Sequence, residues 1–306
     1  MHPCILATCV VPWDERGVFL VEPFVRQVRS LAGALTRHLY LFGTAGEGYA
    51  VTDRQFDEIA GVFVDECRTL DVDPMLGLIS LSTTDVVERI ERWSERGVRD
   101  YQISLPAWHA LDDAELASFF RETCGRFPNC RFLHYNLLRT KRLLAPDDYA
   151  RLAAEHANLV ATKNTGFKGD ELNALVAATP TLTHFVSERG LATVAGTKAA
   201  ERCGLLTSIS SISAARCREY FAAVTRGDAD KVNALFAEIE ILTEALIRHV
   251  GKPRIDGAYD KVLWALHDPS FPLRLLPPYV GGGDEALGAL RQEIAERLPS
   301  WTPEPV

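Results

Sequence analysis

Short apolar runs rich in β-branched residues recur along the chain, and each is followed by a stretch whose apolar residues return at helical spacing. This alternation is typical of βαβ units on a parallel sheet. Eight such units predict an α/β protein whose strands close into a (β/α)8 TIM barrel. The candidate strands are residues 4–10, 38–43, 74–80, 100–105, 130–136, 159–164, 182–188 and 204–210.

The stretches between these strands carry recognisable helix starts. Thr52 and Gln55 have the spacing of a capping box, and Pro146 suits the first position of a helix. We expect residues 1–225 to form a catalytic barrel. Residues 226–306 are expected to supply three more helices, a C-terminal helical extension packed on the barrel.

The main alternative architecture is an open doubly wound sheet. Such a sheet typically carries a glycine-rich phosphate-binding turn after an early strand, and residues 10–17, "VVPWDERG", contain no such turn. The glycine run at 281–283 follows "LLPPYV" rather than a strand. We interpret it as a loop in which Asp284 caps the last helix.

Composition narrows the possible functions. The chain has 306 residues, of which 47% are hydrophobic and 24% charged, and no run approaches the roughly 18 apolar residues of a membrane span. Its start lacks the basic character of a secretory signal, so we expect a soluble, cytoplasmic protein. A formal charge of −8 gives no general attraction for nucleic acid or anionic membranes. Seven scattered cysteines without a C-x-x-C pair indicate neither a disulfide framework nor a thiolate metal site.

Lys163 directly follows the apolar residues Leu159, Val160 and Ala161, at the end of the sixth predicted strand. In a (β/α)8 barrel the active site lies at the carboxyl ends of the strands. Desolvation there disfavours the ammonium form and lowers a lysine pKa from about 10.4 toward neutrality, which makes the amine a nucleophile. Its attack on a 2-keto acid gives an iminium, an electron sink for a carbanion. The alternative is a lysine that extends its charge into solvent.

Two neighbouring strand ends support the catalytic interpretation. Tyr135 ends the strand before the lysine strand, where a phenol is able to carry protons, although such a tyrosine is also typical of a barrel core. Residues 43–48, "GTAGEG", permit a tight turn whose N–H groups, with the Thr44 hydroxyl, would hold a carboxylate. The alternative is a simple turn into the next helix. We expect Glu47 to organise this loop by accepting backbone hydrogen bonds.

These residues together resemble a known family. Residues 43–47 resemble the G-x-x-G-E loop, Tyr135-Asn136 the Y-N strand end, and Lys163 the Schiff-base lysine of the dihydrodipicolinate synthase and N-acetylneuraminate lyase family. The resemblance covers residues 1 to about 225, with the helical tail in keeping. It implies a homo-oligomer, tetramer or dimer, that uses a lysine imine with pyruvate or another 2-keto acid, without a metal or other cofactor.

By this resemblance, Lys163 forms the imine, Tyr135 moves protons, and Thr44 acts with Ala45 to hold the keto-acid carboxylate. Thr44 therefore counts as both catalytic and substrate-binding. Arg139 would bind a second anionic group, with a surface arginine as the alternative. The remaining expected substrate contacts are Glu188, whose alternative role is to cap the following helix, and Ser208.

The sequence also departs from the dihydrodipicolinate synthase pattern. Ala45 replaces the second threonine of the loop, and Trp108 and His109 stand where a tyrosine of the proton relay is expected. The segment that ends in Arg139 is one residue shorter and lacks its proline. We assign no role to His109 or His134, because a lone histidine is more often structural.

The favoured hypothesis is therefore a class I lyase that cleaves, condenses or dehydrates a 2-keto acid, with one derived from a sugar acid as a candidate substrate. Dihydrodipicolinate synthase itself is the first alternative. A barrel that binds a keto acid without turnover is the alternative from another functional class, and pure binding needs no amine nucleophile.

Overall fold

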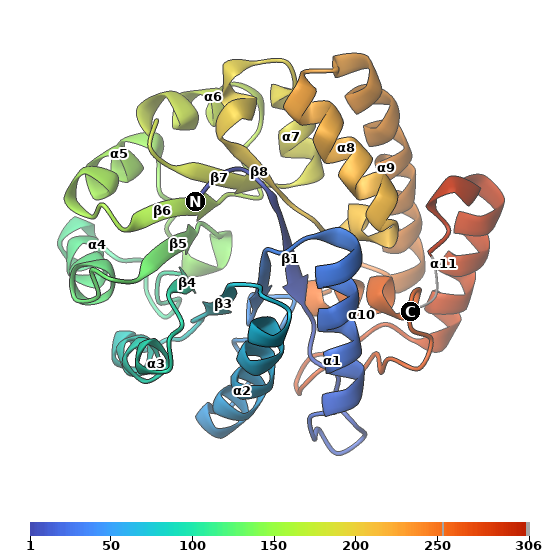
Figure 1. Cartoon of the computed structure of the whole chain (residues 1–306), viewed down its shortest axis with the longest axis horizontal. Coiled ribbons are helices and arrows are strands. Elements are labelled where there is room, and N and C mark those ends of the chain that lie inside the picture. Colours follow the sequence, from blue (N-terminus) through green and yellow to red (C-terminus); the bar gives the residue numbers. More distant parts are fainter. Residues whose placement is uncertain (253, 304–306) are drawn as a thin grey trace.

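A closed barrel of parallel strands forms the centre of the molecule (Figure 1). The computed structural model describes residues 1–252 and 254–303. The strands pair in chain order, and β1 closes the barrel by pairing with β8. The predicted (β/α)8 barrel is thus confirmed. The strands are β1 (Ile5–Cys9), β2 (Leu39–Leu41), β3 (Pro74–Gly77), β4 (Asp100–Ile103), β5 (Arg131–Tyr135), β6 (Leu159–Lys163), β7 (Thr183–Val186) and β8 (Cys203–Leu206).

Helices surround the barrel and extend it at the C-terminal end of the chain (Figure 1). The barrel helices are α1 (Val21–Ser30), α2 (Asp53–Thr69), α3 (Thr83–Glu95), α4 (Asp113–Phe120), α5 (Pro146–Glu155), α6 (Gly169–Ala178), α7 (Glu188–Val194) and α8 (Ala214–Arg226). The extension contains α9 (Ala229–Val250), α10 (Asp256–Ala265) and α11 (Asp284–Arg297), and α9 packs against both α8 and α11. Among the helices of the described residues, none is long and apolar enough to cross a membrane.

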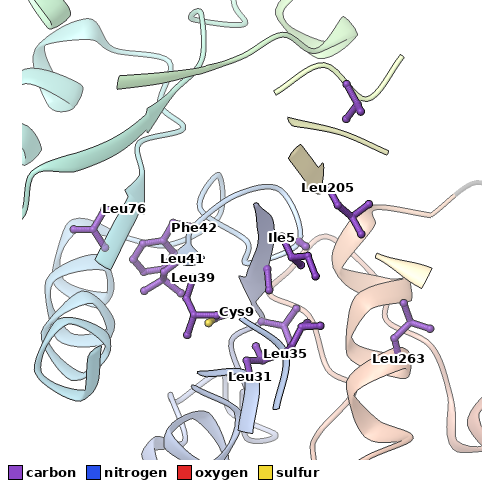
Figure 2. Packing of buried hydrophobic residues seen from close by; sticks show 14 of the residues in the cluster. Ile5, Cys9, Leu31, Leu35, Leu39, Leu41, Phe42, Leu76, Leu205 and Leu263 are labelled. Atoms are coloured by element: carbon purple, nitrogen blue, oxygen red, sulfur yellow. The ribbon is translucent and has the colours of Figure 1, made fainter. Parts of the chain in front are cut away.

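Alternation along each strand divides the buried side chains between two cores. On β2, Leu39 and Leu41 join the large cluster between the strands and the helices, which Figure 2 shows with Cys9, Phe42 and Leu76. Tyr40, between the two leucines, belongs to a separate cluster inside the barrel. Full burial of each such apolar side chain contributes about 1.5–3 kcal/mol. The inner cluster consists of Cys4, Leu6, Tyr40, Met75, Leu133, Ala161, Phe185 and Leu206.

Two of the three predicted helix starts are confirmed. The Thr52 hydroxyl accepts from the Gln55 N–H, and the Gln55 side chain accepts from the Thr52 N–H, which completes the capping box of α2. Pro146 is the first residue of α5. The prediction that Asp284 caps the last helix is wrong, because Gly283 is the N-cap of α11 and Asp284 is already helical. A carboxylate in the first turn is still favourable, since it faces the positive end of the helix dipole.

Candidate active site

A cavity of about 660 Å³ opens at the carboxyl ends of the strands. Lys163, Tyr135 and Tyr40 line its floor in the barrel, and side chains of α9 and α10 line the opposite wall. Its location agrees with the rule that (β/α)8 barrels place active sites at the carboxyl ends of their strands. The cavity joins the barrel to the C-terminal extension, so both parts of the chain build it.

The Lys163 side chain is buried at this floor, with only 4% of its surface exposed. Its Nζ donates a 2.8 Å hydrogen bond to the hydroxyl of Tyr40, and it lies 3.9 Å from the centre of the Tyr135 ring. The register explains the second contact, because Tyr135 on β5 pairs directly with Lys163 on β6. The lysine therefore does not reach into bulk solvent. Two aromatic rings hold its amine inside the cavity.

Tyr40 was missed by sequence reasoning, although its hydroxyl is the group that directly contacts Nζ. Position 40 follows the ordinary alternation of a barrel strand, so an aromatic residue there is typical of a core. Burial raises the pKa of the Tyr40 phenol well above its ordinary value. Tyr40 thus remains neutral and holds the amine. Tyr135, the predicted proton carrier, meets Nζ with its ring face.

A buried polar network fixes the ends of β5, β6 and β7 behind the lysine. The Asn136 amide donates to Asn164 Oδ1 at 2.9 Å, and the Asn164 amide donates to Thr162 Oγ1 at 2.6 Å. Thr162 Oγ1 lies 2.8 Å from Nδ1 of His184. Burial lowers the pKa of His184 to about 4, so this ring is neutral near pH 7. The network restrains Lys163 because both flanking residues, Thr162 and Asn164, take part in it.

His134, to which no role was assigned, belongs to the barrel wall. Its Nδ1 lies 2.8 Å from the Tyr149 hydroxyl, and burial lowers the pKa of His134 to about 3. A neutral, completely enclosed ring of this kind supports the structure.

The G-T-A-G-E loop after β2 forms a tight turn beside the lysine. An ideal Cβ on Gly46 would lie 2.8 Å from the Cys9 carbonyl oxygen, and one on Gly48 would lie 2.3 Å from the Phe42 carbonyl oxygen. Larger residues would therefore push the loop away from β1. Glu47 has a φ of +57°, a left-handed conformation that is uncommon for a residue other than glycine. Such strain persists only where surrounding contacts maintain it.

The loop presents unused hydrogen-bond donors beside the cavity. Within the described part of the chain, the backbone N–H groups of Thr44 and Ala45 donate to no other residue. The Thr44 hydroxyl is also buried and has no partner in residues 1–252 and 254–303, and Ala45 lines the cavity. Buried donors are nearly always paired in proteins, so these groups suit a bound anion such as a carboxylate. Of the two residues, Ala45 lines the cavity and Thr44 does not, and the carboxylate cradle stays a prediction.

Glu47 holds this loop through three partners from distant segments. Its side chain is completely buried and forms a 2.6 Å ion pair with Lys261 of α10, whose side chain is also completely buried. The Trp13 indole N–H donates to Glu47 Oε1 at 2.9 Å, and the Leu276 N–H donates to Oε2 at 2.7 Å. Lys261 also donates to the Arg274 carbonyl oxygen. Glu47 organises the loop as expected, mainly through the C-terminal extension.

Glu188 links the ends of β7 and β8. Its Oε1 accepts from the Ser208 N–H at 3.0 Å and from the N–H and hydroxyl of Ser210, each at 3.1 Å. Ser187, whose hydroxyl accepts from the Gly190 N–H, caps α7 instead. Glu188 and Ser208 both line the cavity. Glu188 thus faces the cavity while it holds the segment that carries Ser208.

Arg139 lies outside the cavity lining and pairs with a carboxylate of the extension. Its guanidinium donates to Asp256 Oδ1 at 2.9 Å, and about half of its side chain is exposed. Asp256 lines the cavity. The charge of Arg139 is therefore already compensated by a protein group. A second substrate carboxylate would compete with Asp256 for it.

The opposite wall of the cavity supplies residues that sequence reasoning missed entirely. Phe236, Glu240, Thr243 and Ile247 recur on one face of α9, and Asp256 and Asp260 are one turn apart on α10. Glu240 is paired with Arg189 at 2.5 Å. The helical spacing is visible in the sequence, but nothing local indicates that this face covers the barrel mouth.

Comparisons with known proteins agree with this geometry. A family model described as the dihydrodipicolinate synthetase family matches residues 2–265. The chain belongs to this family. The 4-hydroxy-tetrahydrodipicolinate synthase of Parasynechococcus marenigrum (strain WH8102) is 24% identical over 293 residues, which cover 95% of this chain and 94% of that protein. The family comprises lyases that act through a lysine Schiff base.

Two solved structures share the fold over nearly their whole length. A prophage protein of the dihydrodipicolinic acid synthase family from E. coli K12, solved in complex with pyruvate, has a TM-score of 0.82 and 16% identity, covering 96% of this chain and 98% of that chain. CdNal from Clostridium difficile, solved in complex with mannosamine, has a TM-score of 0.79 and 15% identity, covering 97% and 99%. At these identities the likeness establishes the fold.

The buried ion pair between Glu47 and Lys261 allows a test of how the loop after β2 is held in place. Glu47→Gln leaves the Lys261 charge without its partner, and we expect the free energy of unfolding to fall by about 3–5 kcal/mol near neutral pH. Burial lowers the pKa of Lys261 to about 8, so the loss should be smaller at pH 9, where this amine is mostly neutral. Urea unfolding at pH 6.5 and pH 9 measures both values.

The matched control is Glu58→Gln, which removes an exposed partner of Arg54 on α2 and should change stability by about 0.5 kcal/mol or less. Equal effects of the two substitutions would show that the buried pair does not support the loop.

Proposed function

We propose that this protein is a class I lyase in which Lys163 forms an imine with pyruvate or another 2-keto acid. The observation that carries the proposal is the position of the Lys163 amine, buried at the floor of the cavity against two tyrosine rings. A ring face attracts a cation, and this attraction supports the positive nitrogen of an iminium. The amine of Lys163 supplies the covalent chemistry without a further cofactor.

The rest of the floor fits the keto acid in this proposal. The free N–H groups of Thr44 and Ala45, with the Thr44 hydroxyl, would bind the carboxylate. That binding would hold the neighbouring ketone carbon against the amine of Lys163. Tyr135 would exchange protons at the adduct and Glu188 and Ser208 would contact the remainder of the substrate. The reaction would take place in the cytoplasm, where free thiols are typical. This location is in keeping with the seven cysteines, which are all buried and free.

The charges around the cavity favour a reactant without a second carboxylate. Asp256 already pairs with Arg139, and Glu240 already pairs with Arg189. A second substrate carboxylate would therefore have to displace Asp256 or Glu240 to pair with either arginine. An uncharged, hydroxylated chain would instead hydrogen-bond to the same groups. This supports a 2-keto acid derived from a sugar acid over dihydrodipicolinate synthase activity.

The first prediction of this proposal concerns the covalent adduct. Incubation with pyruvate and borohydride should add a reduced pyruvyl group, and peptide mapping should locate it on Lys163. Lys163→Met should abolish the adduct, while Lys141→Met, which removes a lysine whose amine bonds the Trp108 carbonyl oxygen on an outer loop, should retain it. Intact-mass spectrometry measures both. If a panel of 2-keto acids leaves the parent protein unmodified, the barrel binds keto acids without turnover or serves another function.

A second prediction concerns the choice of substrate. We expect 2-keto acids with uncharged, hydroxylated chains to be cleaved to pyruvate or dehydrated, with a kcat/KM at least tenfold above that for pyruvate with aspartate semialdehyde. A coupled lactate dehydrogenase assay measures pyruvate, and NMR identifies dehydrated products. A preference for aspartate semialdehyde would instead establish dihydrodipicolinate synthase as the function.

A third prediction concerns assembly, for which we propose a homo-oligomer, a dimer or tetramer. Trp108 and Leu138 are 80% and 78% exposed, and the Lys141 amine joins their two loops by bonding the Trp108 carbonyl oxygen. Exposed apolar side chains on adjoining loops favour burial against a second subunit. Trp108→Glu should lower the mass measured by light scattering, whereas Val21→Glu, 46% exposed at the start of α1, should not. A parent protein that is monomeric at all concentrations would contradict this.

A further inference from the structure

The carboxyl group of Asp260 interacts electrostatically with the reactive lysine across the cavity that both residues line. Asp260 lies on α10 and lines the same cavity as Lys163. It also lines a second, much smaller cavity between α10 and the start of the barrel, together with Thr8 and Thr207. The next residue, Lys261, is fixed by its ion pair with Glu47, so the rotation of α10 that aims Asp260 inward is set by a buried contact.

The surroundings of Asp260 hold its carboxyl in the protonated form near neutral pH. The pKa of Asp260 is raised to about 8, mainly by burial and also by the charge of Asp256, while Lys163 opposes the rise. The titratable groups that face it from the packed elements are Tyr40 of β2, Lys163 of β6, Glu188 of α7, Asp256 of α10 and His267 beyond α10.

Tyr135, which lies against Nζ, is the proposed carrier of the proton that moves from nitrogen to oxygen as the carbinolamine forms. Few other groups at the floor are suited to donate the further proton that the departing hydroxyl needs. Ala45 offers only a methyl group beside the cavity. Burial raises the pKa of the Tyr40 phenol far above neutrality, and its hydroxyl is occupied by Lys163. A carboxylic acid whose pKa lies near the working pH is well matched to general acid–base catalysis. The geometry therefore distinguishes Asp260 from the hydroxyl groups around it.

We propose that Asp260 exchanges protons with the keto-acid adduct on Lys163. This inference rests on the proposed function, since it requires an imine at Lys163.

In the first step, neutral Lys163 attacks the ketone carbon and forms a carbinolamine after proton transfer from nitrogen to oxygen. Asp260 then gives its proton to the carbinolamine hydroxyl; the C–O bond breaks, water leaves, and the nitrogen lone pair forms the C=N bond of the iminium. The Asp260 carboxylate next takes a proton from the C3 methyl group, and the C–H electron pair forms the enamine. Asp260 ends protonated, as it began, and no other reactant is needed.

The test uses pyruvate as the probe, because both steps proceed without a second substrate. The readouts are the rate of borohydride-trapped adduct formation and the exchange of pyruvate methyl protons for deuterium in D2O, followed by NMR from pH 6 to pH 9.5. For Asp260→Asn we expect exchange to slow at least 100-fold, in line with the typical range for general acid–base catalysis, while the adduct on Lys163 still forms on long incubation. Lys163→Met supplies the background.

The pH profile adds a signature that a structural role would not produce. The acid form of Asp260 is present below its pKa, so parental adduct formation should decline above about pH 8. Asp256→Asn removes a charge that raises the pKa of Asp260. In this variant the rate of adduct formation should therefore begin to decline at a lower pH than in the parent. In Asp260→Asn the decline should vanish.

Thermal unfolding shows whether the variant folds, and it gives a second test of the raised pKa of Asp260. Folding raises the pKa of the Asp260 carboxyl, so the folded protein loses stability as the pH rises from about 4 to about 8. Asp260→Asn removes this ionisable group, and its Tm relative to that of the parent should therefore increase across that interval. If Asp260→Asn fails to fold, Asp260→Ser replaces it in every measurement.

Normal adduct formation in the parent, with exchange in Asp260→Asn within threefold of the parental rate, would overturn this inference and leave the proposed function intact. Failure of the parent to form an adduct with any 2-keto acid would overturn both.

Discussion

The buried ion pair between Glu47 and Lys261 is the contact on which the candidate site depends. It joins the loop after β2 to α10, and the bonds from Trp13 and Leu276 bring in the loop after β1 and the segment after α10. Two charges out of water are tolerated only when their remaining hydrogen bonds are satisfied, as they are here. The pair therefore specifies the position of α10, since it forms only when the helix has one height and one rotation over the barrel.

Two properties of the site follow from this ion pair between Glu47 and Lys261. Glu47 is held at a strained φ in the loop whose Thr44 and Ala45 N–H groups have no partner among the described residues. Gly257 lets α10 approach closely, since an ideal Cβ there would lie 3.0 Å from the Ala45 carbonyl oxygen. The same helix thus supports the proposed carboxylate cradle from behind and presents Asp260 to the cavity. A barrel without the extension would retain Lys163 but lose both of these features.

The barrel and the lysine were predictable because each depends on local pattern and topology. Eight apolar runs with helical intervals specify the closed sheet, and the rule for strand ends then places Lys163 and Tyr135 together. Tyr40 was not predictable in the same way, because an aromatic residue in mid-strand is indistinguishable from core. The wall of the cavity depends on tertiary packing, of α9 against α7 and α8 and of α10 against the distant loop that carries Glu47, and no local pattern encodes it. The N-cap of α11 was predicted one residue too late, at Asp284, because glycine and aspartate both suit the start of a helix.

Several features of the candidate site oppose the stability of the fold. The left-handed Glu47, the unpartnered hydroxyl of Thr44 and the carboxyl of Asp260 all oppose stability, and all adjoin the loop or the cavity. The opposite end of the barrel core is conventional by comparison, with apolar residues such as Cys4 and Leu6 packed inside it. An apolar residue in place of Asp260 would avoid this cost, because a carboxyl whose pKa is raised to about 8 destabilises the fold at neutral pH. In the proposed mechanism this cost places a transferable proton beside the amine of Lys163.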